Sequence, residues 1–510
     1  MLGLALGVAV LRQLRRGLAR TDVVASTAVA ALALGLTLGV APRTSRIFYD
    51  EQIYQNIGQN LADLKLAQMC NDGAVDDGRL RCFSGEYNKQ PYAYPHVLSL
   101  AYRAFGIGAT TAFAVNATIM AVTACFVYLL VLILFEDRTA AFFAALLLAL
   151  TPEQIVWSAT AAAEPSASLA CVGALLAAAC FVRWRTTVTL IGAAVAAAYA
   201  VQFRPESALI VPVVALLLWQ RTRDEFTRPR LWWAGLLFLT LAAVHVGHIV
   251  AVRNEGWGTT HERLSLSYVA GNLRVNGWFY LADARFPATF TLLAIAGLSG
   301  RRAGRGRLAI ALHFLLFFGI ALLFYAGSYD YGADVRYSLS TYPPLVILGG
   351  LGMARLVHAF ERARSGLPVW QAATAALAVQ FLWYVPVVRT TADGAWAARA
   401  DVAFARSLVP GLRGNSYVLT HNPGMFQVWG VNAGQMSLAV TNPAYLDDLA
   451  TRYTDGIYLH WNFWCNVQDP IQREFCTKIL DLRPGDPVRE HREQDQRYIL
   501  YRLKYPTPAP

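Results

Sequence analysis

Charged residues are scarce in this chain of 510 residues. They make up only 15% of it, against roughly 25% in ordinary soluble domains, while 56% of the residues are apolar and the mean hydropathy is +0.37. A soluble globule of this length has too little interior to hide so many apolar side chains. The same composition excludes a disordered chain, a collagen-like chain and a coiled coil. The sequence therefore predicts an α-helical polytopic membrane protein.

Long basic tracts and RNA-binding motifs are also missing, although the net charge is +11. The arginines lie instead in short loops between apolar runs, so we expect no nucleic-acid partner. Eleven apolar runs are candidate membrane spans. They are Val23–Val40, Thr110–Phe135, Thr139–Trp157, Pro165–Trp184, Val188–Val201, Ser207–Trp219, Leu231–Val252, Phe286–Leu298, Leu308–Ala326, Tyr337–Met353 and Leu367–Val388. For the short fifth and sixth runs, a buried hairpin is the alternative.

Arginine is distributed unevenly between alternate loops. The loops 12–22, 136–138, 183–186, 220–230, 300–307 and 354–366 hold 18 arginines in 50 residues. The other set, 42–108, 152–163, 203–205, 253–285 and 327–336, holds 13 lysines and arginines in 125 residues. The positive-inside rule then places the N-terminus in the cytoplasm and the long loops outside. We read Met1–Leu11 as a surface helix and Val23–Val40 as a retained span, because no cleavage site precedes the long loop.

Two regions differ from the apolar runs. The loop 42–108 is far longer than an ordinary connection and is expected to carry function. From about residue 389 onwards, strand-like and helix-like segments alternate, which predicts a small C-terminal α/β domain outside the membrane. The expected strands are Ser416–Thr420, Met436–Val440, Gly456–His460 and Arg497–Leu503, and the expected helices are Asp401–Leu408, Ala444–Thr451 and Ile471–Leu480. We expect domains 1–388, including the loop, and 389–510.

Cysteines are few, and four of the seven form two close pairs. Cys70 and Cys82 lie in the long loop, and Cys465 and Cys476 lie in the tail. Both pairs fall on the expected outer side, which favours two local disulfides over zinc, because histidine and carboxylate partners at ligand spacing are missing. The aromatic segment 458–465 could stack on a sugar, but we favour a strand that ends in a core or membrane-facing turn.

The first candidate for chemistry follows the first span directly. Asp50 and Glu51 stand at the start of a segment, Asp50–Leu66, whose apolar spacing predicts a helix along the interface. A carboxylate there is placed to take a proton from a hydroxyl, and an acid that stabilises the helix start is the alternative. Further along the loop, Lys89 and His96 lie in an aromatic turn before an amphipathic helix and could contact an anionic head group.

Ionisable residues recur at the expected outer ends of the spans, namely Glu153, Glu164, Arg204, Glu206, Asp330, Asp334 and Arg336. Charge at membrane depth is costly and usually faces a cavity or a partner. Their common side predicts one outer cavity, and snorkelling or separate local ion pairs are the alternative.

Four segments together resemble the GT-C superfamily of membrane glycosyltransferases. They are Tyr49-Asp50-Glu51 after the first span, Lys89-Gln90-Pro91-Tyr92 before a short helix, Phe203-Arg204-Pro205-Glu206, and Val335-Arg336-Tyr337 before a Pro343-Pro344 span. The chain resembles most the branch of protein O-mannosyltransferases (glycosyltransferase family 39) and lipid A aminoarabinose transferases. In the loop turn, many members have paired prolines where this chain has Gln90-Pro91.

The resemblance implies an inverting enzyme that transfers a sugar from a polyprenyl-phosphate carrier to an acceptor hydroxyl on a lipid, polysaccharide or protein. It implies that Asp50, with Glu51 beside it, is the base, and that Arg204 and Arg336 hold the lipid phosphate, with Lys89 or His96 as further contacts. Glu164 and Tyr337 would line the cavity. We expect no obligatory metal, although a divalent cation near Asp50, Glu51 and Glu164 is an alternative. The expected location is the inner (cytoplasmic) membrane of a bacterium.

Three other functions stay open at this stage. A transporter or flippase of lipid-linked sugars would also have many spans, but no inverted repeat is visible. An oligosaccharide ligase would move a preassembled glycan, and a non-catalytic assembly subunit would only recruit partners.

Overall fold

The computed structural model of the chain describes residues 12–13, 17–47, 49–253, 262–299, 304–330, 334–363, 368–393, 396–412, 414–467 and 470–505. The chain divides into two compact units. The first comprises residues 1–43 and 116–393, and the second comprises residues 44–115 and 394–510. Each unit is therefore built from two separate stretches of the sequence.

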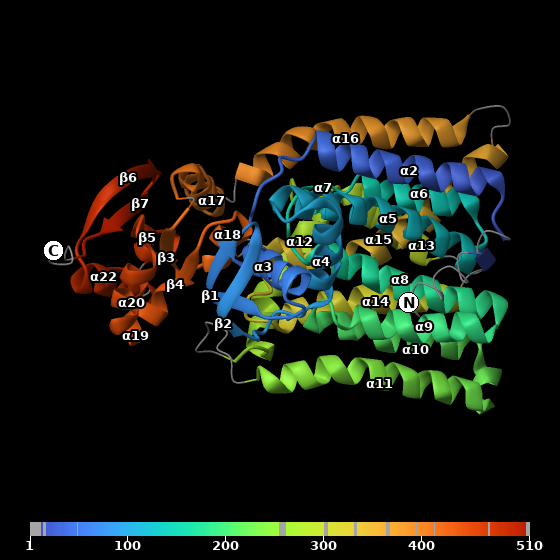
Figure 1. Cartoon of the computed structure of the whole chain (residues 1–510). Helices are drawn as coiled ribbons and strands as arrows, with labels where there is room; N and C mark the ends of the chain where they lie inside the picture. Colours follow the sequence, from blue (N-terminus) through green and yellow to red (C-terminus); the bar gives the residue numbers. More distant parts are fainter. Residues whose placement is uncertain are drawn as a thin grey trace. The chain divides into compact units, whose positions relative to one another are not determined.

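The first unit is helical, and its long helices run roughly side by side (Figure 1). Its helices are α2 (Arg20–Gly39), α5 (Ala109–Phe135, whose first turns fall in the second unit), α6 (Arg138–Ala149), α7 (Pro152–Ser158), α8 (Glu164–Trp184), α9 (Thr187–Ala200), α10 (Ile210–Arg221), α11 (Pro229–Ala251), α12 (Val269–Ala282), α13 (Ala288–Leu298), α14 (Gly304–Leu323), α15 (Tyr342–Ala363) and α16 (Val369–Asp393). Short 3-10 turns η1 (Pro205–Leu209), η2 (Arg223–Thr227), η3 (Leu266–Tyr268) and η4 (Asp334–Ser340) stand between them.

Each of the eleven predicted apolar runs contains a helix, but not every helix is long enough to cross a bilayer. Among the described residues, seven helices qualify by length and composition, and the number rises to eight if α6 and α7, bent by 60°, form one broken span. The predicted runs at α9, α10 and α13 give helices of only 14, 12 and 11 residues. The polytopic helical architecture is confirmed, whereas the count of eleven full spans is larger than helix length alone supports.

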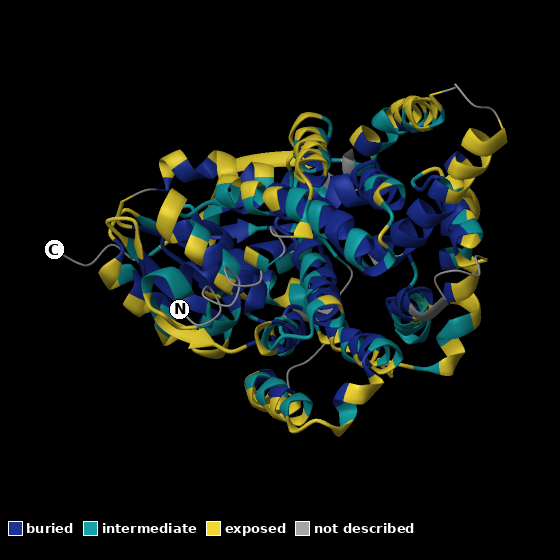
Figure 2. Cartoon of the chain, turned by 90° about the vertical axis from the view of Figure 1, so that its right-hand side faces the viewer, coloured by how far each residue is buried: buried dark blue, intermediate teal, exposed yellow. Residues whose placement is uncertain are grey.

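Apolar side chains cover the outside of this unit. In α11 and α16 only 17% of the most apolar stretch is buried inside the protein. Exposed side chains include Trp232 and Trp233 on α11 and Leu382 and Trp383 on α16. Figure 2 shows buried residues within the helical unit and exposed residues on peripheral helices. A chain surrounded by water would not leave such faces open, so these helices are built to face lipid.

Glycine allows a close contact between α13 and α15 in the first unit. A Cβ atom added at Gly297 of α13 would lie 1.9 Å from the carbonyl oxygen of Leu348, and one at Gly352 of α15 would lie 2.0 Å from that of Leu293. Only a residue without a side chain allows these two backbones to approach so closely, as in other packed membrane helices.

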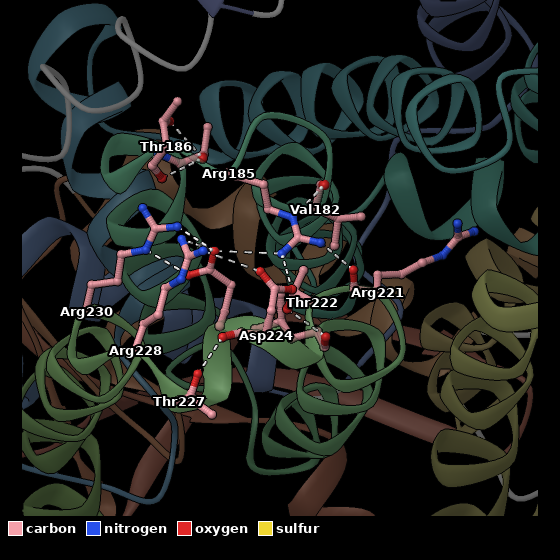
Figure 3. A network of polar contacts seen from close by, with 12 residues as sticks. Val182, Arg185, Thr186, Arg221, Thr222, Asp224, Thr227, Arg228 and Arg230 are labelled. Atoms are coloured by element: carbon pink, nitrogen blue, oxygen red, sulfur yellow. Dashed lines mark hydrogen bonds and ion pairs between the residues drawn. The ribbon is translucent and has the colours of Figure 1, made fainter.

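A polar network joins the loop before α11 to the end of α8 (Figure 3). At its centre the side chain of Glu225 is only 1% exposed and forms ion pairs with Arg185, Arg228 and Arg230. Arg185 also forms an ion pair with Asp224 and donates to the carbonyl oxygen of Arg221. These arginines lie in the loops 183–186 and 220–230, two of the arginine-rich loops expected on the cytoplasmic side.

The second unit contains a seven-stranded mixed sheet in the order β2-β1-β4-β3-β5-β7-β6. Its strands are β1 (Met69–Asp76), β2 (Arg79–Glu86), β3 (Ser416–Thr420), β4 (Ala433–Gln435), β5 (Gly456–Trp461), β6 (Gly485–Glu493) and β7 (Gln496–Leu503). The strands β4, β3 and β5 are parallel, and the remaining pairings are antiparallel. Strand β1 of the long loop pairs with β4 of the tail, as Figure 1 shows in blue and orange-red.

Helices cover both faces of this sheet. The helices of the unit are α3 (Asp50–Asp63), α4 (Ala93–Phe105), which packs on α3, α17 (Trp396–Leu408), α18 (Pro423–Val428), α19 (Met436–Thr441), α20 (Ala444–Arg452), α21 (Phe463–Asn466) and α22 (Pro470–Leu482), with a 3-10 turn η5 (Val409–Gly411). One apolar cluster joins α17 and α18 to Val418 of β3, and a second joins α19, α20 and α22 to Tyr417 and Leu419. Alternate residues of β3 thus point to opposite cores, as the pleat requires.

The long loop packs with the tail. Asn56 of α3 donates a hydrogen bond to Gln427 of α18 at 2.8 Å and accepts one from the backbone N–H of Cys70 at 2.8 Å. The sequence analysis placed residues 42–108 with the helices of domain 1–388. The structure differs, because strand pairing and these buried amide contacts assign residues 44–115 to the unit that holds the tail.

Most predicted elements of the loop and tail occur in the structure, with one clear exception. The expected helix at Asp50 and all three expected tail helices form, as do three of the four expected tail strands. The segment Met436–Val440, predicted as a strand, is the helix α19. Short apolar runs of this length fit either element, and here the side chains of Met436 and Ala439 pack one turn apart against the sheet. The predicted surface helix Met1–Leu11 lies outside the described residues.

Candidate functional site

Asp50 begins α3, directly after a residue in an unusual conformation. Tyr49 has φ 64°, in the left-handed region, and its ring lies 6.0 Å from the ring of Trp464 in α21. A bulky residue pays a conformational cost there, and such strain persists only where the surroundings hold it. The contact with Trp464 ties the start of α3 to the C-terminal stretch of the same unit.

A chain of side-chain hydrogen bonds orients the Asp50 carboxylate. Gln90 donates from Nε2 to Oδ1 of Asp50 at 3.1 Å, and Tyr54 donates its hydroxyl to Oε1 of Gln90 at 2.8 Å. Tyr54 itself is only 1% exposed, so this chain is anchored in the core. Sequence reasoning noted Gln90 only as a departure from a proline pair and missed its contact with Asp50, because residues forty positions apart carry no local signal.

Glu51, the second predicted catalytic carboxylate, has a different environment. It is fully buried, and its Oε1 accepts hydrogen bonds from the backbone N–H groups of Arg46 at 2.6 Å and Ile47 at 3.1 Å. A buried carboxylate that binds two backbone donors stabilises the turn before α3. These contacts favour a structural role for Glu51 and leave Asp50 as the better candidate base.

Lys89 and His96 flank the segment that carries Gln90, the partner of Asp50. Lys89 precedes Gln90 in the turn after β2, and Asn88 fixes this turn by accepting from the backbone N–H of Gln90 at 2.9 Å. His96 stands in the first turn of α4 and is exposed. The turn that contains Lys89 therefore contacts Asp50 through the side chain of Gln90.

The remaining predicted site residues form a second cluster, which lies in the first unit. Glu164 at the start of α8 accepts a hydrogen bond from Arg204 at 2.5 Å and forms an ion pair with Arg336 at 3.0 Å. Arg204 also forms an ion pair with Glu206. Both guanidinium groups lie over the ring of Tyr337, at 5.3 and 5.1 Å from its centre. The four predicted residues of this unit are thus brought together, and all are largely buried at their side chains.

Removing several ionised groups from water costs folding free energy. A buried cluster of this kind is therefore a candidate functional site. The cluster combines two arginines with two carboxylates, those of Glu164 and Glu206, and each guanidinium group carries five N–H donors in one plane. Such an arrangement suits an anion with several oxygens, such as a phosphate. This cluster and the Asp50 region belong to different units, and each is described by itself.

A third polar group, which sequence reasoning missed, lies at the carboxyl ends of the parallel strands β3 and β5. The Nε2 atom of His460 lies 3.2 Å from Oδ1 of Asp401, and its other ring nitrogen lies 3.2 Å from the hydroxyl of Thr420. Next to it, the Nδ1 atom of His421 accepts from Asn462 at 3.1 Å, and its Nε2 lies 3.1 Å from the carbonyl oxygen of Gln472. Burial lowers the pKa of His421 to about 4, so this ring is neutral near pH 7.

The four cysteines of the long loop and the tail pair as expected. Cys70–Cys82 links β1 to β2, and Cys465–Cys476 links α21 to α22. Within the described part of the chain, the one group with metal-ligand spacing is His421 with Cys465 and Cys476, whose ligand atoms lie within 4.8 Å of one another. Both sulfurs of that group are already bonded in a disulfide, which favours the disulfide reading over zinc.

Residues 89–248 match the model of a family described as dolichyl-phosphate-mannose-protein mannosyltransferase. This segment includes the turn with Lys89, the helices α4 to α10 and most of α11. Among curated protein sequences, none matches the chain significantly.

Several solved structures share the fold. ArnT from Cupriavidus metallidurans bound to undecaprenyl phosphate superposes with a TM-score of 0.57 at 14% identity, over 95% of this chain and 98% of that one. Its apo form gives a TM-score of 0.58 at 14% identity, over 94% and 97% of the two chains. The oligosaccharyltransferase from Archaeoglobus fulgidus in its apo form gives 0.52 at 13% identity, over 86% and 69%. The similarity to ArnT extends over nearly both full chains, so the ArnT-like fold includes the mixed sheet as well as the helices. The resemblance to membrane glycosyltransferases inferred from the sequence is confirmed.

Proposed function

We propose that this chain is a membrane glycosyltransferase that moves a sugar from a polyprenyl-phosphate carrier to an acceptor hydroxyl on the extracytoplasmic side. The family match over residues 89–248 and the ArnT-like fold support the class of enzyme. The observation that carries the reaction is the Asp50 carboxylate, held by Gln90 at the start of α3. A positioned carboxylate is what proton removal from a hydroxyl requires.

In the proposed reaction, the acceptor oxygen attacks the anomeric carbon while Asp50 takes its proton. The bond between the anomeric carbon and the phosphate oxygen breaks at the same time, and the electron pair leaves with the lipid phosphate. A single displacement of this kind inverts the anomeric centre. Gln90 binds Oδ1 of the carboxylate and thereby orients the group. The other oxygen of Asp50 is then the proposed acceptor of the proton.

Arg204 and Arg336 are the proposed partners of the departing phosphate. Negative charge grows on that group during the reaction, and fixed guanidinium donors stabilise it. Glu164 holds both arginines through a single oxygen atom, which orients their N–H groups before any ligand binds. We propose Lys89 and His96 as further contacts of the donor head group.

Undecaprenyl phosphate is bound in the ArnT structure, and the archaeal oligosaccharyltransferase AglB has been solved with a dolichol-phosphate and an inhibitory peptide. A polyprenyl phosphate is therefore the expected carrier for this chain. The acceptor is a hydroxyl of a lipid, a polysaccharide or a protein. We propose a reaction without an obligatory metal, so EDTA is expected to leave the rate unchanged.

The test uses purified protein in liposomes with radiolabelled polyprenyl-phosphate sugars and a panel of acceptors. Asp50→Asn is expected to lower transfer by about 10² to 10⁴, because one positioned base contributes that much. Asp77→Asn, in the exposed turn between β1 and β2, is the matched control and should keep full activity.

Each outcome of this assay separates one function from another. Normal turnover in Asp50→Asn removes the base assignment. Movement of the labelled lipid across the bilayer without transfer would identify a flippase. Transfer only from donors with preassembled glycans would identify an oligosaccharide ligase.

A further inference from the structure

A cavity of about 410 Å³ lies in the second unit, between the sheet and α22. Its floor is made by β5 and β7, and its wall by α21 and α22; Figure 1 shows α22 beside these strands. This volume falls in the range of small-ligand sites and is more than one sugar ring occupies. The residues that line it are separate from Asp50 and from the arginine cluster.

The floor of this cavity is aromatic. Trp461 of β5 stands directly opposite Ile499 of β7, and Tyr501 follows two residues later on the same face. The rings of Trp461 and Tyr501 lie 6.2 Å apart at an angle of 67°. Both side chains are half-buried, so they present part of their rings to the cavity. Aromatic faces of this kind stack against the C–H groups of a sugar ring.

The wall of the cavity is polar. Arg473, Thr477 and Asp481 follow at intervals of four residues on α22 and therefore share one face of the helix. Arg497 of β7 closes the polar side and is paired with Glu490 at 3.2 Å. Planar guanidinium and carboxylate groups bind neighbouring hydroxyl groups in pairs, as donor and acceptor respectively.

The cavity is also rigid at its base. The disulfide Cys465–Cys476 fastens α21 to α22, and Asn466 donates to the carbonyl oxygen of Arg497 at 2.7 Å, which fastens α21 to β7. The three elements around the cavity are thus tied together before any ligand arrives. A preformed site loses less conformational entropy on binding.

From these observations we propose that this cavity binds a saccharide through a pyranose ring, with the ring on Trp461 and Tyr501 and its hydroxyls on Arg473 and Asp481. The mixed charges make a neutral sugar the expected ligand, because Asp481 and Glu490 offset the two arginines. A saccharide site at this place is independent of the transfer step at Asp50. It would let the enzyme retain a glycan that carries the acceptor or the product.

The experiment measures saturation-transfer NMR on the full chain in nanodiscs, with glucose, mannose, galactose, maltose and glucuronate as probes. We expect at least one neutral sugar to receive saturation from the protein. Asp481→Asn and Arg473→Gln are expected to weaken that binding about tenfold, since each removes a hydrogen bond to a charged group. Lys478→Gln, on α22 but outside the cavity lining, is the matched control and should bind like the unchanged protein.

Two further measurements separate loss of sugar binding from loss of folding and from loss of transfer activity. The melting temperature of each variant should match that of the unchanged protein, because both side chains are exposed on α22. Asp50→Asn should bind the sugars normally even if transfer is lost. No sugar signal in the unchanged protein, equal signals in all variants, or binding of glucuronate alone would each overturn the proposal.

Discussion

Gln90 shows how a single side chain can control a candidate base from outside the reaction. Its amide group stands between the hydroxyl of Tyr54 and the carboxylate of Asp50, and it contacts both. The side chain has no acid or base chemistry of its own near neutral pH. Its effect on the reaction must therefore come through the direction in which Asp50 points.

Gln90→Leu is expected to lower kcat by about ten- to a hundredfold, because a free Asp50 side chain samples unproductive positions. KM for the lipid donor should stay nearly unchanged, and Tyr54→Phe should give a smaller loss in the same direction. Gln496→Leu, at the start of β7, is the matched control. Liposome transfer kinetics with varied donor measure both constants, and an unchanged kcat in Gln90→Leu would remove the positioning role.

His421 makes the stability of the second unit depend on pH. Its pKa is lowered from 6.5 to about 4, chiefly by burial, so the folded state binds fewer protons than the unfolded state between these values. The hydrogen bonds with Gln472 and Asn462 fit a neutral ring, and His460 and Asp401 face it from β5 and α17. Stability should stay level above pH 6.5 and fall as the pH drops towards 4, by up to about 3 kcal/mol.

The measurement is thermal unfolding from pH 4 to pH 8 in detergent. His421→Gln is expected to flatten the acid slope, whereas His491→Gln, on the exposed strand β6, should leave it as it is. Identical slopes in the unchanged protein and His421→Gln would contradict the prediction.

For single residues, the sequence was informative where the interacting residues lie close together in the chain. Asp50 could be located because it begins a helix after an apolar run, and both disulfides could be paired because their cysteines lie close together in the chain. The contacts of Tyr49 with Trp464 and of Asp50 with Gln90 join distant residues. Such contacts depend on tertiary packing, which no local pattern encodes.

Among the elements, the short turn η2 is held in position by ion pairs of its buried residue Glu225. Three arginines from the loop and from the end of α8 converge on it. The hydrogen bond from Arg230 keeps the pKa of Glu225 below its usual value, so the ion pairs persist at neutral pH. This turn links α10 to α11, whose apolar surface is largely exposed.

Glu225→Gln is expected to lower the melting temperature by several degrees, because it removes the buried negative charge on which Arg185, Arg228 and Arg230 converge. The neighbouring Asp224→Asn should change little, since that side chain is 60% exposed and its ion pairs are screened by water. Thermal unfolding in the same detergent compares the two variants. A larger loss in Asp224→Asn than in Glu225→Gln would contradict this account of the network.

The elements that the sequence predicted well are those with long, uniform patterns. All eleven apolar runs contain helices, because length and composition alone define such segments. The hairpin of β1 and β2 was missed, since its strands carry polar residues and glycines and depend on pairing with β4. The segment at α19 was misassigned because six residues are too few to distinguish the 3.6-residue period of a helix from the two-residue period of a strand.

For the whole molecule, the sheet of the second unit limits the membrane topology. Strands from the long loop and from the tail pair directly, so these two regions lie on the same side of the membrane. The chain between them must therefore cross an even number of times. Six long candidate helices, α5, α8, α11, α14, α15 and α16, satisfy this condition. If the bent pair α6–α7 also crosses, an odd number of the shorter helices must cross with it.

Thiol labelling with a membrane-impermeant reagent tests this arrangement. Asp77→Cys in the loop and Asp455→Cys in the tail are expected to react from the same side, because their regions share a sheet. Asp224→Cys should react only from the other side, since it lies in an arginine-rich loop. Labelling of positions 77 and 455 from opposite faces would be incompatible with the sheet.

The pairing of β1 with β4 also dictates the order of assembly during synthesis. Residues 72 and 434 are neighbours in the sheet, yet the whole helical stretch 116–393 is made between them. The hairpin of the loop must wait, with one edge open, until the tail emerges and supplies its partner strand. A ribosome that stops before β4 would thus release a chain with its helices inserted but with an unprotected strand, open to proteases and to wrong pairing.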